Sequence, residues 1–91
     1  MVTAVILIGT VRSKINEIAQ ALVDIPGVSE VYSVAGRHDL VAILRVKSND
    51  DVARVVTDDI TAIAGIERTE TLIAFQAYSK HDLEAMFSVG F

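Results

Sequence analysis

The sequence contains no cysteine and no tryptophan, and only one proline interrupts its 91 residues. A chain without cysteine forms no disulfides, thiolate zinc sites or thiol nucleophiles. Cations are also scarce: eight lysines and arginines stand against twelve aspartates and glutamates, and the net charge of −4 argues against a basic nucleic-acid surface. No apolar run approaches the roughly 20 residues that cross a membrane, and no cationic leader is visible. We therefore expect a soluble, cytoplasmic protein.

Apolar residues are abundant, at 52% of the chain, against 22% charged residues. This balance argues against intrinsic disorder, and the length suits one domain rather than a multi-domain enzyme. The apolar periodicity predicts six elements and a tail. In chain order these are a strand over 2–9, a helix capped by Ser13 and stopped by Pro26, strands over 28–35 and 40–46, a helix capped by Ser48 and ended by Gly65, a strand over 67–78, and a short helix around 83–87.

The order strand, helix, strand, strand, helix, strand predicts a ferredoxin-like βαββαβ sandwich of the α+β class. A weak internal repeat supports it, because Ile25-Pro-Gly-Val28 and Ile63-Ala-Gly-Ile66 occupy the same helix-to-strand corner 38 residues apart. Right-handed crossovers place both helices on one face of a four-stranded antiparallel sheet. We expect residues 1–78 to form this domain and 79–91 to form a partly helical C-terminal tail that packs on a neighbouring subunit.

The strands do not alternate between apolar and polar residues. In the first strand Ile6 and Ile8 point to one face of the sheet, and Val5 and Leu7 point to the other. Two helices cover only one face, and soluble monomers avoid large exposed apolar patches. The simplest cover is a second copy, sheet against sheet, so we predict a homodimer of the dimeric α/β-barrel type. The alternative is that the tail folds back over the sheet of its own chain.

The most informative polar motif is the turn Gly36-Arg37-His38-Asp39 between the second and third strands. Backbone N–H groups of a tight turn suit a carboxylate, and an aspartate accepts from an ammonium group, so the turn matches both ends of an α-amino acid. It equally suits a plain hairpin in which Asp39 bonds its own backbone. Thr69 and Thr71 add two hydroxyls on one sheet face, either for a ligand or for cross-strand threonine pairing.

Arrangements for catalysis or metal binding are not evident. His38 and His81 are the only histidines, and each stands beside an aspartate; we interpret His81-Asp82 as a solvated surface pair, and two histidines without close-spaced partners do not make a metal site. Gly9-Thr10 lacks the Gly-Lys-Ser/Thr of a phosphate-binding loop. We therefore predict no enzyme activity, no metal and no cofactor.

Four segments form a joint pattern at specific spacings. They are Ile-Pro-Gly-Val-Ser-Glu-Val-Tyr-Ser-Val at 25–34, Gly36-x-x-Asp39-Leu40-Val41, Gly65-Ile66, and Thr69-x-Thr71-Leu72-Ile73-Ala74-Phe75. This pattern resembles the ligand-binding domain of the Lrp/AsnC transcription regulators, called RAM for regulation of amino-acid metabolism. The resemblance covers Val2 to Tyr78, and the tail is similar to that of short actinobacterial members.

The resemblance implies a ferredoxin-like fold, dimers built by facing sheets, and assembly of dimers into octamers or rings. It also implies that small effectors, usually amino acids, bind in clefts between dimers. By match to the family, Gly36, Asp39, Thr69 and Thr71 are the candidate ligand-binding residues. Arg37 and His38 occupy variable positions of the turn, where they would tune ligand choice.

Family regulators carry a helix-turn-helix before this domain, whereas here the sequence begins at the first strand. The chain therefore resembles stand-alone RAM proteins, and we expect an amino-acid sensor or regulatory subunit without direct DNA binding. Co-assembly with full-length regulators is an expectation of the same resemblance. The alternatives are a small cofactor-independent monooxygenase or isomerase of the dimeric α+β barrel group, a ligand-free structural partner of a regulator, and an ACT-like domain.

Overall fold

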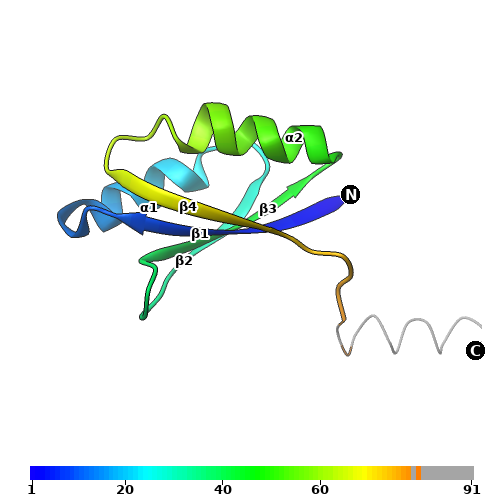
Figure 1. Cartoon of the computed structure of the whole chain (residues 1–91), viewed down its shortest axis with the longest axis horizontal. Coiled ribbons are helices and arrows are strands. Elements are labelled where there is room, and N and C mark those ends of the chain that lie inside the picture. Colours follow the sequence, from blue (N-terminus) through cyan, green and yellow to red (C-terminus); the bar gives the residue numbers. More distant parts are fainter. Residues whose placement is uncertain (79, 81–91) are drawn as a thin grey trace, which may run out of the picture.

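Both helices lie on one face of a four-stranded antiparallel sheet (Figure 1). The computed structural model describes residues 1–78 and residue 80, so the predicted tail helix lies outside the described residues. The strand order is β2-β3-β1-β4, and every neighbouring pair is antiparallel. The predicted ferredoxin-like α+β fold is confirmed. Its elements are β1 (Val2–Thr10), α1 (Ile15–Val23), β2 (Val28–Ser33), β3 (Leu40–Val46), α2 (Asn49–Arg54) and β4 (Ile66–Ile73).

The two serines predicted as helix caps behave differently. Ser48 precedes α2, and its Oγ accepts the N–H of Asp51 at 3.2 Å, as predicted. Ser13 instead lies inside a short 3-10 turn, Arg12–Lys14, that leads into α1, and it caps neither helical segment. Val11 precedes this turn: its carbonyl accepts the Lys14 N–H at 3.0 Å, and its own N–H donates to the Gly65 carbonyl at 2.8 Å, which holds the end of β1 in place.

The second helix changes its pitch along its length. α2 runs directly into a π-helical segment, Val55–Ile60, in which the Thr61 N–H donates to the carbonyl of Val56, five residues earlier. Within the part of the chain that the structure describes, no helix has the length and apolar character needed to span a membrane.

The fourth strand is shorter than the apolar pattern predicts. It ends at Ile73, whereas the sequence predicts a strand as far as Tyr78. The reason is the antiparallel register with β1: Ile73 lies opposite Ala4, and the Ala74 N–H donates to the Thr3 carbonyl at 2.9 Å. β1 itself starts at Val2, so no strand remains to pair with residues 75–78.

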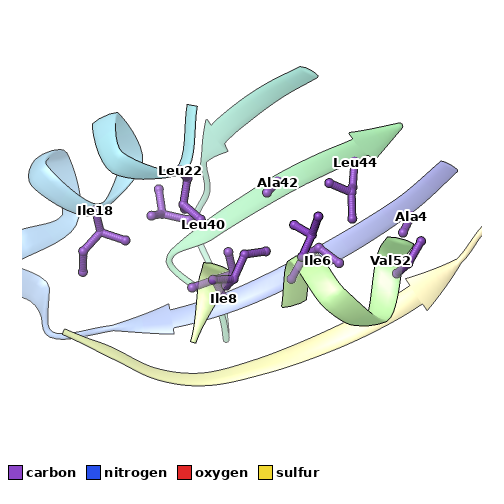
Figure 2. Close-up of a cluster of buried hydrophobic side chains, with 11 residues drawn as sticks. Ala4, Ile6, Ile8, Ile18, Leu22, Leu40, Ala42, Leu44 and Val52 are labelled. Atoms are coloured by element: carbon purple, nitrogen blue, oxygen red, sulfur yellow. The ribbon is translucent and has the colours of Figure 1, made fainter. Parts of the chain in front are cut away.

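The core lies between the helices and the helix-facing side of the sheet (Figure 2). β1 and β3 present alternate residues to it, and cross-strand partners such as Ile6 and Ala42 are both fully buried. Burial of these aliphatic side chains is the main stabilisation of the fold. The core residues are Ala4, Ile6, Ile8, Leu40, Ala42 and Leu44 from the sheet, and Ile18, Leu22, Val52, Val55 and Ile60 from the helical segments.

The opposite side of the sheet, which we call the open face, is also apolar at its centre. Its apolar residues are Val5, Leu7, Val41, Ile43 and Leu72, which the strand registers place together. Four of them are only partly buried, and Leu72 keeps 46% of its surface exposed. Figure 1 shows both helices on the other side of the sheet. The sequence-based expectation of two apolar faces is thus confirmed.

The capping difference gives a matched pair of variants. Ser48→Ala removes the acceptor for the Asp51 N–H, and we expect it to lower the free energy of unfolding by about 1 kcal/mol. For a domain of this size that is a fall in Tm of roughly 4–8 °C. Ser13→Ala removes no cap and should leave Tm nearly unchanged. Thermal unfolding at one protein concentration checks both variants, and equal losses would contradict the assignment.

Candidate functional site

A cleft of about 360 Å³ opens at the end of the sheet where β1 leads into α1. Three segments meet there: the end of β1, the turn between β2 and β3, and the start of β4, all at the left of the sheet in Figure 1. The volume lies at the lower end of the range of small-molecule sites, about 300–1,000 Å³. Its lining residues are Thr10, Val11, Arg12, Gly36, Arg37, Asp39, Glu67 and Arg68.

Asp39 joins the turn to the end of the central strand. Its backbone N–H donates to the Ile8 carbonyl at 2.9 Å, and its Oδ2 accepts the N–H of Thr10 at 2.8 Å. The side chain therefore satisfies a donor on β1 rather than one within its own turn. Gly36 supplies the turn geometry, because its φ of 122° is a conformation that residues with a Cβ rarely adopt. Both ends of the Gly36-x-x-Asp39 motif thus have a structural role in shaping the cleft.

Arg68 closes the other side of the cleft. It lies opposite Gly9 in the register of β1 and β4, and its side chain crosses β1 over this glycine. Its Nη2 donates to the carbonyl of Arg37 at 2.6 Å, so β4 and the β2–β3 turn are linked across the central strand. A Cβ on Gly9 would lie 2.6 Å from the Arg68 Cζ, which is too close for real atoms. Glycine at position 9 thus leaves room for the Arg68 side chain, which would have to move if a Cβ were present.

The cleft concentrates cations in an acidic protein. Three of the chain's five arginines line it, with the two carboxylates of Asp39 and Glu67, while the whole chain carries a net charge of −4. Charges of both signs around a small volume match a zwitterion, and the excess of arginine favours a ligand with an anionic group. No group of three or more potential metal ligands occurs among the described residues.

The structure brings together only part of the predicted site. Gly36, Arg37 and Asp39 line the cleft, whereas His38 does not, and its Nδ1 is buried without a hydrogen-bond partner. Thr69 and Thr71 lie opposite Ile8 and Ile6, on the helix-facing side of the sheet and away from the cleft lining.

Within one protomer, therefore, the threonines do not meet the turn. A ligand site that includes them across subunits stays a prediction. Thr69 is partly buried and Thr71 is exposed at the β4 edge of the sheet, where a neighbouring subunit has access to them.

Sequence reasoning missed Arg68, Glu67, Thr10 and Arg12 as lining residues. One signal was available for Arg68: Gly9 interrupts a β-branched strand, and a glycine inside a strand often marks the close approach of another group. The same alternation that puts Thr69 on the helix side puts its neighbour Arg68 on the open face. Which group approaches Gly9 depends on the strand register, and the sequence alone does not specify it.

A second polar cluster lies on the open face near its β2 edge, remote from the cleft lining. The Tyr32 hydroxyl donates to Glu30, and Arg45 donates to Ser29 Oγ at 2.6 Å and forms an ion pair with Glu30 at 3.4 Å. The Tyr32 hydrogen bond, followed by Arg45, lowers the pKa of Glu30, and the same bond raises the pKa of Tyr32. These groups form a polar rim beside the apolar centre of the open face.

Comparison with known proteins shows which family the chain is similar to. Residues 3–83 match the family model described as the Lrp/AsnC ligand binding domain. An uncharacterised HTH-type transcriptional regulator of Pyrococcus horikoshii is 37% identical over 60 residues, which cover 66% of this chain and 40% of that protein. The HTH-type transcriptional regulator FL11 of Pyrococcus furiosus is 32% identical over 79 residues, 87% of this chain and 52% of that protein. The chain thus spans about half or less of the length of these relatives.

Solved structures resemble the fold closely. The crystal structure of TTHA0845 from Thermus thermophilus superposes with a TM-score of 0.83 and 44% identity, over 88% of this chain and 100% of that chain. A feast or famine regulatory protein from M. tuberculosis, complexed with L-methionine, has a TM-score of 0.74 and 27% identity, over 88% of this chain and 54% of that chain.

The contact between Asp39 and Thr10 predicts a graded effect of two substitutions. Asp39→Ala leaves the Thr10 N–H without its acceptor and should lower the free energy of unfolding by about 1–3 kcal/mol. Asp39→Asn keeps a side-chain oxygen in place and should cost less. The control is Asp58→Ala, which alters an exposed acid of the π-helical segment. Chemical denaturation measures all three, and an Asp39→Ala variant as stable as the control would rule out the structural role of Asp39.

Proposed function

The chain belongs to the Lrp/AsnC ligand-binding domain family, and from that premise we propose that it is an oligomeric amino-acid-binding module that serves as a sensor or regulatory subunit. The observation that carries the proposal is the mixed-charge cleft at the β2–β3 turn. Asp39 and three arginines line this cleft together, and an α-amino acid carries the complementary ammonium and carboxylate charges.

An amino acid is the ligand class best supported by the relatives. The M. tuberculosis regulatory protein, with the same fold and 27% identity, was solved with L-methionine. In the present chain the turn residues Gly36 and Asp39 match the motif of the family resemblance, and Arg37 and His38 stand between them at its variable positions. We infer that the chain binds an amino acid and that Arg37 and His38 tune which one.

A role as a separate module is consistent with the Thermus thermophilus protein, which this chain covers over its entire length. The curated relatives are HTH-type regulators, and the matched segments make up only 40% and 52% of their length. We propose that the module either senses its ligand alone or co-assembles with a full-length regulator through related surfaces. Binding rather than catalysis is the proposed activity, because the family is regulatory and the cleft groups named above serve recognition.

The open face supports the oligomer in this proposal. Its apolar centre joins residues of three strands, and a second copy placed sheet against sheet would remove that surface from water. In such an assembly further contacts between dimers would bring Thr69 and Thr71 of one subunit toward the turn of another. This arrangement would unite all the residues predicted from the sequence.

A screen of the twenty amino acids by thermal shift, followed by calorimetry, tests the ligand class. At about one hundred times its Kd, an amino acid that binds the folded protein should stabilise it by roughly 2.7 kcal/mol. Asp39→Asn should weaken binding at least tenfold because it loses the charge that faces the ammonium group, while Asp58→Asn should bind like the unmodified chain. The absence of any amino-acid ligand would contradict the proposal.

Light scattering tests the oligomer. The unmodified protein should contain no monomer at micromolar concentration. Leu7→Glu places a charge at the centre of the open face and should produce a folded monomer, because Leu7 is not part of the core. The control, Ala53→Glu, alters an exposed position of α2 and should remain oligomeric. A monomeric unmodified protein would rule out this interface.

A further inference from the structure

We propose that Arg68 binds the carboxylate of the ligand and that Gly9 is the positioning residue for its guanidinium group. The inference rests on the proposed function and makes it more specific: the cleft would select molecules with a free carboxylate next to an amino group. Amides and esters of the same amino acids would be poor ligands. No part of the sequence pattern that resembles the family includes Arg68, so its role comes from the geometry alone.

The guanidinium of Arg68 is held in place by its neighbours. Its Nη2 donates to the Arg37 carbonyl at 2.6 Å, and its side chain lies against the bare backbone of Gly9. Arg12 and Arg37 also line the cleft, but among the described residues no hydrogen bond or ion pair fixes the side chain of either one. A ligand bound by Arg68 therefore requires less loss of side-chain freedom than one bound by the other two arginines.

Arg68 also keeps N–H groups that can donate hydrogen bonds to a ligand. A guanidinium carries five N–H groups in a planar fork, and the carbonyl of Arg37 occupies one of them. Planar forks match carboxylates with two parallel hydrogen bonds, which lysine does not offer. On the same cleft Asp39 uses Oδ2 to accept the Thr10 N–H, and its carboxylate supplies the negative charge that an ammonium group needs. The two ends of an amino acid thus have separate, oppositely charged partners.

Gly9 positions Arg68 by leaving room for its side chain, and not by an unusual backbone conformation. Its φ is not in the positive region, whereas Gly27, Gly36 and Gly65 are. Alanine is therefore compatible with the backbone at position 9, and its conflict is the added Cβ, which would lie 2.6 Å from Cζ, 2.7 Å from Nη1 and 2.9 Å from Cγ of Arg68. Because all three atoms belong to one exposed, flexible side chain, the conflict is relieved when that side chain moves off β1 and carries the guanidinium with it. Gly9→Ala thus displaces the charge while leaving Arg68 in the sequence.

The experiment is calorimetry with free amino acids and with the corresponding α-amides, on the unmodified chain and on four variants. We expect the unmodified chain to prefer the free L-amino acid, with L-methionine and L-methioninamide as the first pair, by at least tenfold. Arg68→Gln should lose at least tenfold in affinity for the acid and little for the amide. Arg68→Lys should fall between the two, and Gly9→Ala should behave like Arg68→Gln. Arg54→Gln, which changes an exposed arginine of α2, should bind like the unmodified chain.

The outcomes separate the two proposals. If the unmodified chain binds no amino acid of the twenty, both the proposed function and the role of Arg68 are wrong. If it binds amino acids but Arg68→Gln keeps the preference for acid over amide, the function stands and the role of Arg68 is overturned. A variant that melts earlier yet retains that preference would indicate a purely structural role, and this also overturns the assignment. Loss of the preference in both Arg68→Gln and Gly9→Ala supports it.

Discussion

The arrangement of this protein depends on β1, one of the two inner strands of the sheet, which pairs with β3 along one edge and with β4 along the other. Its side chains alternate between the two sides of the sheet, so one strand determines what each side can do. Ala4, Ile6 and Ile8 face the helices and are fully buried, which makes that side a dry core. Val5 and Leu7 face the other way and make the second side equally apolar. The proposed cover on the open face follows from this alternation.

The same strand explains where the cleft forms. Its last three residues, Ile8 to Thr10, are those to which the rest of the site attaches: Asp39 bonds to Ile8 and Thr10, and Arg68 lies over Gly9. Gly9 and Thr10 follow the last aliphatic residue of β1, and the Ile8 carbonyl and the Thr10 N–H are hydrogen-bonded to Asp39. The cleft is therefore built on a rigid element that is tied down on both edges, which suits a site that must hold charged groups in a defined geometry.

The fold could be predicted from the sequence because its information is local. Apolar spacing identified the elements, and the bounds predicted for β3, Leu40–Val46, match those of the structure. The length of β4 could not be predicted in this way. It depends on where the neighbouring strand, β1, starts and on the register in which the two strands pair. Ser13 and Ser48 are equally plausible caps in the sequence, but only Ser48 caps a helix, and Val11 beside the 3-10 turn is bonded to Gly65, which is distant in sequence. Local patterns predict elements, and long-range pairing sets their limits.

The site was only half predictable for the same reason. The turn motif Gly36-x-x-Asp39 is contiguous and was visible in the sequence, whereas Arg68 reaches the turn only through the register of β4 on β1. The register also places two consecutive residues of β4 on opposite sides of the sheet. Thr69 lies on the helix-facing side, and Arg68 lies on the open face, the side of the proposed dimer surface.

Arg68 therefore lies on the same side of the sheet as Val5 and Leu7, one strand away from them. A second copy that covers this side would exclude water near the guanidinium, and an ion pair is stronger where water is excluded. A carboxylate bound there would in turn neutralise a charge at the margin of an apolar contact. By reciprocity, whatever free energy assembly adds to ligand binding is the free energy that the ligand adds to assembly. In the proposed assembly, ligand recognition and oligomer formation would be coupled without a separate moving part, because β1 lies beside both the cleft and the apolar centre of the open face.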